Sequence, residues 1–194
     1  MPKPRVTALR PRPGGRVLVQ VDGEDWRVLH AQVVVRARLA VGSDLDRERL
    51  VEVARERRRA DALATAGAAL RARDLPARRL EQRLERRGIA PGARADALET
   101  LQGIGLVDDA RYARNRALAL AGRAAGDAAI RHDLEQQGLT GEVIEAAIEG
   151  LEPERLRAER VVVRRGRSHA TARFLARKGF ANEVVEAASG EVLG

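Results

Sequence analysis

The sequence predicts a mainly α-helical chain, in which tandem three-helix units form an elongated, curved stack after a small N-terminal β-hairpin. Three observations predict this class. Strand signals are confined to the first 41 residues, Ala, Leu, Arg and Glu dominate from about Asp44 onward, and one helix-ending pattern occurs three times. The 194 residues are 44% hydrophobic, which is enough to bury a core. We therefore expect an ordered chain.

The N-terminal segment carries the strand signals. In the stretch RVLVQVDGEDWRV, Val17, Val19 and Val21 alternate with other residues, as in a strand with one buried face. Asp22 and Gly23 follow, and this dipeptide favours a tight hairpin turn. We expect a β-hairpin and a linking helix within residues 1–59. Because so small a hairpin is marginally stable alone, it docks either on the first helical unit or on a partner.

One pattern occurs three times in the helical part. RRLEQRLERRGI, AAIRHDLEQQGL and ATARFLARKGF each contain a leucine, a glycine four residues later, and an apolar residue directly after the glycine. In such a helix ending the leucine faces the core, the glycine adopts the left-handed conformation, and the next apolar residue folds back on the last turn. The predicted cap glycines are Gly88, Gly138 and Gly179.

Each copy of this pattern lies between two further helical segments. The segments after the second and third copies, TGEVIEAAIEGL and ANEVVEAASGEV, place apolar residues at helical spacing. The sequence therefore predicts three-helix units at 60–107, 108–151 and 152–194. No unit of this size buries its faces alone, so we expect neighbouring units to stack.

Two adjacent carboxylates, Asp108 and Asp109, lie at the expected junction between the first and second units. We interpret them as caps of a helix start, because an Asp side chain accepts hydrogen bonds from free N–H groups and suits the positive end of the helix dipole. The alternative is a site that holds a metal or moves a proton. No further oxygen ligands follow at the spacing of a calcium loop, so we predict no metal site.

The sequence contains no pattern typical of an enzyme. The three histidines are far apart, without an HExxH motif, and the serines lie in no nucleophile-elbow pattern. The GIG run at 103–105 lacks the third glycine of a dinucleotide site, and there is no Walker A run or cysteine. No apolar signal region or membrane-spanning run is present. We expect a cytoplasmic monomer without catalytic activity, cofactor or membrane contact.

Positive charge is concentrated near the C-terminus of a chain whose net charge is +8. Residues 155–178 contain nine Lys or Arg against one carboxylate, whereas 108–151 contain five Arg against eight Asp or Glu. Four arginines at spacings of 3, 4 and 3 share one helix face: Arg157, Arg160, Arg164 and Arg167. This stripe suits a phosphate backbone or an acidic protein groove, and a solvated helix face is the alternative that the spacing leaves open.

A second basic concentration runs from Arg55 to Arg79 and includes Arg71 and Arg73. Carboxylates dilute it, so a solvated surface is the stronger interpretation there. Aromatic residues make up 2% of the chain, too few for a base-stacking platform. Any contact with single-stranded DNA should therefore be made to the backbone and should be sensitive to salt.

Several stretches together resemble the RecX family of bacterial RecA regulators. They are IGLVDDARYA, GDAAIRHDLEQQGL, FLARKGF, and the hairpin RVLVQVDGEDWRV with VGSDL after it, so the resemblance covers nearly the whole chain. Its most specific part is DDARYA followed by four residues at intervals of four: Gly126, Ile130, Leu134 and Gly138. The chain departs from the family in its first unit, where Asp74 and Arg79 replace the usual Ser and Glu.

The resemblance implies a non-enzymatic protein that lies in the groove of the RecA filament on single-stranded DNA. It would inhibit ATP hydrolysis and strand exchange there, promote filament disassembly and so modulate recombination and DNA repair. We expect the stripe of Arg157, Arg160, Arg164 and Arg167 to provide much of the attachment. The further candidate contacts with the filament or its DNA backbone are Arg173, Arg177, Lys178, Arg71 and Arg73.

Two other function classes stay open at this point. A helical DNA-binding protein without a recombinase partner would explain the positive charge. A protein–protein adaptor would use the repeats and ignore nucleic acid. The salt dependence of DNA binding distinguishes the two classes. Phosphate contacts weaken steeply as the salt concentration rises, whereas an adaptor does not bind DNA at all.

Overall fold

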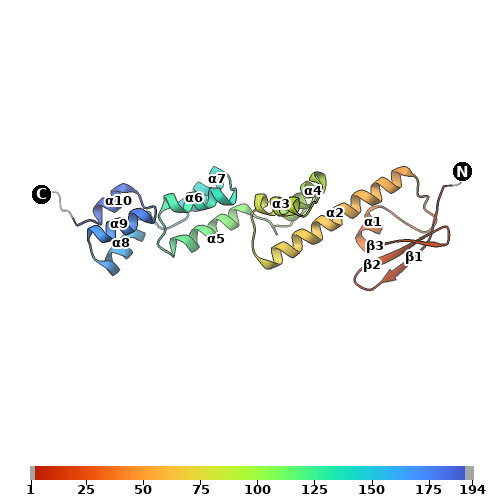
Figure 1. Cartoon of the computed structure of the whole chain (residues 1–194), viewed down its shortest axis with the longest axis horizontal. Coiled ribbons are helices and arrows are strands. Elements are labelled where there is room, and N and C mark those ends of the chain that lie inside the picture. The colour runs from red at the N-terminus through yellow and green to blue at the C-terminus, as the bar shows by residue number, and fades with distance from the viewer. Residues whose placement is uncertain (1–2, 191–194) are drawn as a thin grey trace. The chain divides into compact units, whose positions relative to one another are not determined.

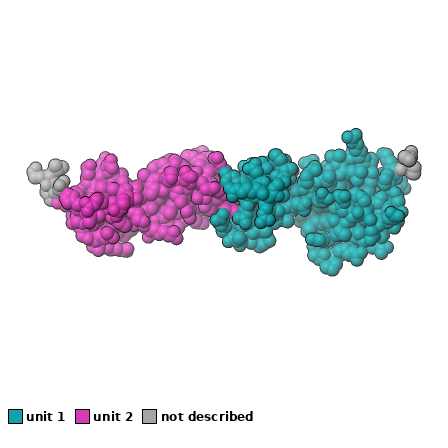
Figure 2. All heavy atoms as spheres, viewed as in Figure 1, with its two compact units in different colours: residues 1–73, 80–104 teal, residues 74–79, 105–194 magenta. Residues whose placement is uncertain are grey.

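The computed structural model describes residues 3–190 and divides the chain into two compact units (Figure 2). Unit 1 comprises the chain up to Arg73 together with Leu80–Ile104, and unit 2 comprises Asp74–Arg79 together with the chain from Gly105 onward. Residues 1–2 and 191–194 lie outside the described residues. They are the first residues of the segment expected at 1–59 and the last residues of the segment expected at 152–194. Strands occur in the N-terminal part of the described chain and helices after it, so the prediction of a mainly helical fold is confirmed (Figure 1).

The N-terminal element is a three-stranded antiparallel sheet in the order β1-β2-β3. Asp22 and Gly23 have φ of 50° and 90°, so they form the predicted tight turn. The prediction of a two-stranded hairpin is wrong in the number of strands. The additional strand is β1, which contains Pro11 and lies at the sheet edge, where Pro is tolerated. The strands are β1 (Val6–Arg12), β2 (Arg16–Val21) and β3 (Glu24–His30).

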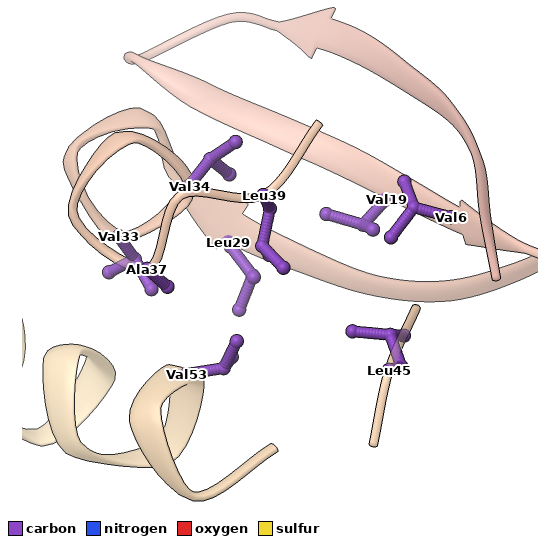
Figure 3. Packing of buried hydrophobic residues seen from close by; sticks show 9 residues of the cluster. All are labelled: Val6, Val19, Leu29, Val33, Val34, Ala37, Leu39, Leu45 and Val53. Carbon is purple, nitrogen blue, oxygen red and sulfur yellow. The ribbon is translucent and has the colours of Figure 1, made fainter. Parts of the chain in front are cut away.

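One face of this sheet packs against α1 (Ala31–Arg36) and the beginning of α2 (Arg47–Ala72). Val19 and Leu29 of the sheet, Val33 of α1 and Val53 of α2 belong to one buried cluster, which Figure 3 shows between the strands and the helices. The buried helix residues against which the sheet packs therefore precede the unit expected at 60–107 and belong to the segment expected at 1–59.

Helix α2 is 26 residues long and continues through the boundary expected at residue 60. The division into three-helix units at 60–107, 108–151 and 152–194 stays a prediction, as does the elongated, curved stack. The helices that follow α2 are α3 (Ala77–Arg86), α4 (Pro91–Gly103), α5 (Asp109–Ala121), α6 (Asp127–Gln137), α7 (Gly141–Glu149), α8 (Glu154–Arg165), α9 (His169–Arg177) and α10 (Asn182–Ala187).

The same helix ending terminates α3, α6 and α9. Gly88, Gly138 and Gly179 follow these helices with φ of 73°, 84° and 77°, a region that side chains disfavour. In each ending the residue after the glycine donates a backbone hydrogen bond to the carbonyl of the buried leucine, which is the bond of a Schellman motif. These bonds run from Ile89 to Leu84 at 3.1 Å, from Leu139 to Leu134 at 3.4 Å and from Phe180 to Leu175 at 3.2 Å.

A bidentate ion pair joins α5 to α6. Arg116 Nε and Nη2 donate to the two carboxylate oxygens of Asp133, each at 2.8 Å. The hydrogen bond from Arg116 lowers the pKa of Asp133 below its ordinary value. Because the folded state then releases this proton more readily than the unfolded state, the pair stabilises the fold above a pH of about 3.9. The stabilisation is lost as the pH falls through the lowered pKa.

We expect Asp133→Asn to reduce the free energy of unfolding at pH 7 by about 1 kcal/mol or less, since both side chains are partly exposed and screened by solvent. The reduction should shrink progressively below pH 4, where the parent carboxylate also becomes protonated. Urea denaturation across this pH range measures the difference. Glu149→Gln, a neutralisation at an exposed position of α7, is the control, and an equal pH profile for both variants would contradict the prediction.

Candidate functional site

The two carboxylates at the start of α5 cap two different helices. Asp108 is the N-cap of α5 and accepts a hydrogen bond from Arg111 N at 2.8 Å. Asp109 accepts a hydrogen bond at 2.8 Å from the backbone N of Ala77, the first residue of α3. Both carboxylates therefore lie at positive helix ends. Within residues 3–190, no group of three or more His, Cys, Asp or Glu side chains is arranged to hold a metal ion.

Glu154, the first residue of α8, repeats the arrangement of Asp109. Its Oε1 accepts a hydrogen bond at 2.7 Å from the backbone N of Asp127, the first residue of α6. Its Oε2 accepts another at 3.1 Å from Ala181 N, at the start of α10. A carboxylate on the first residue of one helix thus caps an earlier helix at both places. This gives Asp109 and Glu154 a structural role.

The prediction that Arg157 belongs to a surface stripe is wrong. This residue is 5% exposed. Its guanidinium donates hydrogen bonds to the carbonyls of Glu152 at 2.9 Å and Ala125 at 2.7 Å, and it also binds the Asp127 carboxylate. Arg157, Arg160 and Arg164 lie on α8, but Arg167 lies beyond its end at Arg165, so the prediction that all four share one helix face is also wrong. At Arg157 the face is covered by the segment that leads into α6. Arg157 is therefore not available to an external partner.

The other three arginines of the stripe are exposed but differ in what they contact. Arg160 forms an ion pair with Glu152. The Arg167 guanidinium donates a hydrogen bond to the carbonyl of Ala187 at the end of α10. Arg164 has no ion-pair partner among the residues that the structure describes. The stripe therefore offers one unengaged guanidinium rather than four.

Two basic side chains lie beside the ring of Phe174 of α9. The guanidinium carbon of Arg165 lies 4.4 Å from the centroid of the Phe174 ring, and Lys178 Nζ lies 5.8 Å from it. Such cation–π contacts hold the two positive groups near one ring. The exposed arginines 173 and 177 lie on the same helix. We call the basic residues at the end of α8 and along α9 up to its C-cap the α8–α9 basic surface, and it comprises Arg164, Arg165, Arg173, Arg177 and Lys178.

The sequence prediction omitted Arg165 from this surface. Its contact with Phe174 depends on how α8 and α9 pack, and no residue spacing within either helix indicates it. Arg71 and Arg73 are also exposed, but they lie at the end of α2 in unit 1, whereas the α8–α9 basic surface belongs to unit 2.

Proteins of similar sequence identify the family of this chain. A protein of Deinococcus radiodurans named "Regulatory protein RecX" is 31% identical over 148 residues, which are 71% of this chain and 71% of that relative. The chain belongs to the RecX family. RecX proteins of Halorhodospira halophila and Chromohalobacter salexigens are 34% and 37% identical over 122 and 123 residues, 58% of this chain in each case and 76% and 80% of those relatives. No family model matches the chain.

Solved structures of RecX proteins have the same fold. A crystal structure of "regulatory protein RecX" matches with a TM-score of 0.84 at 20% identity, covering 97% of this chain and 100% of the other. The structure of RecX from Lactobacillus salivarius matches with a TM-score of 0.59 at 16% identity, covering 68% and 94%. The curated RecX relatives are named as regulatory proteins rather than as enzymes. No described helix of this RecX-family chain is both long and apolar enough to cross a membrane.

Proposed function

We propose that this chain regulates a RecA-type recombinase by binding in the groove of the RecA filament on single-stranded DNA. It inhibits ATP hydrolysis and strand exchange there, and so modulates recombination and DNA repair in the cytoplasm without catalysing a reaction itself. The observation that carries the proposal is the α8–α9 basic surface in a chain of the RecX family.

The chemistry of α8 supports a partner that contains both protein and DNA. Helices α8 and α10 border an open groove lined by Val162, Val163 and Val184, among others, and Val163 is 85% exposed. Protein interfaces have an apolar centre with a polar rim, whereas phosphate contacts require cations. Because α8 contributes to both the groove and the basic surface, its surroundings fit a nucleoprotein filament better than naked DNA.

The direct test is the single-stranded-DNA-dependent ATPase rate of a RecA recombinase during titration with this chain, with DNA in excess. We expect inhibition at well below one molecule per recombinase protomer. The reason is that a molecule bound to the filament acts on the filament as a whole rather than on one free protomer. Inhibition that begins only when the DNA is saturated would indicate competition for DNA. That outcome would favour a DNA-binding protein without a recombinase partner.

The double variant Arg164→Glu/Arg177→Glu tests the surface itself. We expect about tenfold or more weaker binding to the filament, because the reversed charges turn attraction to phosphates or to acidic protein faces into repulsion. Binding is measured by co-sedimentation at fixed salt. Arg114→Glu/Arg123→Glu makes the same charge change at exposed positions outside the surface and serves as the control. Equal affinities for the two double variants would remove the α8–α9 basic surface from the proposal.

A further inference from the structure

The sheet of unit 1 has a second face that the core does not use. The core cluster takes Val19 and Leu29 from one face of the sheet, as Figure 3 shows. Because side chains alternate along a strand, Arg16 and Leu18 of β2 point to the other face. The pairing register places Arg10 and Arg12 of β1 on this outer face as well. All three arginines are exposed.

The pairing register brings these arginines close together. Arg12 lies directly opposite Arg16, and Arg16 lies opposite His30 of β3. Residues paired in this way have Cβ atoms about 4.5–5.5 Å apart, and Arg10 is two residues, or roughly 7 Å, from Arg12 on the same strand. The outer face of the sheet therefore carries three guanidinium groups on neighbouring positions.

This arrangement has a local cost, because like charges directly opposite each other destabilise a sheet. Other arginines of unit 1 have partners, since Arg5 pairs with Asp44 and Arg36 with Glu56, each at 3.0 Å. Within residues 3–190, none of the three sheet arginines has a carboxylate in ion-pair contact. The carboxylate of Asp25, which lies opposite Gln20 in the register, accepts a hydrogen bond at 2.7 Å from the Gln20 amide rather than from one of these arginines. Among the described residues, the three guanidinium groups are thus not neutralised by an ion pair.

The composition of the face favours nucleic acid over protein as the binding partner. Leu18 is 6% exposed, so Val28, at 49%, is the main apolar side chain accessible beside the arginines. Protein interfaces have an apolar centre, whereas nucleic-acid interfaces are more polar and much more positively charged. We propose that the outer face of the sheet is a further binding site, for the phosphate backbone of single-stranded nucleic acid. Arg10, Arg12 and Arg16 contact the phosphates. The site needs no recombinase, so it goes beyond the proposed function and can be tested apart from it.

The test measures the affinity of the full chain for a fluorescent single-stranded oligothymidylate, without recombinase, at several salt concentrations. Each phosphate contact contributes about 0.7 to the slope of log affinity against log salt. We expect Arg10→Gln/Arg12→Gln/Arg16→Gln to lower the magnitude of the slope by about 2 and the affinity at 0.1 M salt roughly tenfold or more. Arg10→Lys/Arg12→Lys/Arg16→Lys keeps the charges and should keep the slope. Circular dichroism should show both variants folded, since the substitutions are exposed and the first removes like-charge repulsion.

The control is Arg47→Gln/Arg57→Gln/Arg114→Gln, which removes the same charge at exposed positions outside the sheet. An equal loss of slope in this control would show that net charge alone is responsible and would overturn the site. An unchanged slope in the sheet variant would also overturn it. If the sheet variant bound the oligonucleotide normally but a recombinase filament weakly, the face would contact protein instead, again against the proposal. The ATPase titration tests the proposed function independently of all three outcomes.

Discussion

Gly126→Ala is expected to destabilise unit 2 by about 3 kcal/mol or more, because this position has no room for a Cβ. A Cβ there would lie 2.2 Å from Gly179 O and 2.3 Å from Phe180 N. These are backbone atoms, so no side-chain rotation relieves the clash. The approach is fixed by two hydrogen bonds, from Gly126 N to Lys178 O at 2.8 Å and from Ala128 N to Gly179 O at 3.2 Å. The start of α6 would have to separate from the turn that follows α9.

Thermal and urea denaturation measure this effect, and each kcal/mol shifts the melting temperature of a domain of this size by about 4–8 °C. Gly141→Ala is the matched control. It lies at the first residue of α7, and a Cβ there would meet nothing within 4 Å. We expect the control to be as stable as the parent or slightly more stable, because alanine favours helix. A Gly126→Ala protein within about 1 kcal/mol of the control would show that α6 and the α9 turn do not approach this closely.

Helix ends were predictable from the sequence because their chemistry is local. A leucine, a glycine four residues later and an apolar residue define an ending whose hydrogen bonds stay within six residues. The role of Gly126 was not predictable in this way, although the residue belongs to the pattern that resembles the family. Its need for glycine comes from the backbone of Gly179, which is distant in the sequence. Spacing within α6 carries no information about that contact.

The two carboxylates of α5 show the same limit. Asp108 caps a backbone N three residues later, which is the spacing that an N-cap predicts. Asp109 caps a backbone N that lies 32 residues earlier, and only the tertiary fold of unit 2 brings the two together. The third strand, β1, lies outside the predicted hairpin. It contains Pro11, and a proline is tolerated in a strand that lies at the sheet edge, but the order of strands is not a local property.

Arg157→Leu is expected to cost about 3–5 kcal/mol of stability, because it breaks a buried ion pair and leaves polar groups without partners. The side chain of Arg157 is 4% exposed, and its Asp127 partner is 30% exposed. The buried carbonyl of Ala125 would also lose its donor. Arg157→Lys should lose much of the same free energy, since an ammonium cannot reproduce a planar fork that donates to three acceptors. Arg164→Leu, on the same helix but exposed, should change stability by about 0.5 kcal/mol or less.

The Arg157 variants distinguish a structural role of this residue from a role in binding the filament. If Arg157 holds α8 to the start of α6, its variants unfold more readily, yet the folded fraction at low temperature binds the filament with parental affinity. If Arg157 were instead a filament contact, its variants would melt like the parent and bind weakly. Urea denaturation and filament co-sedimentation on the same samples distinguish the cases. Parental stability with weak binding would contradict the buried network and return Arg157 to the binding surface.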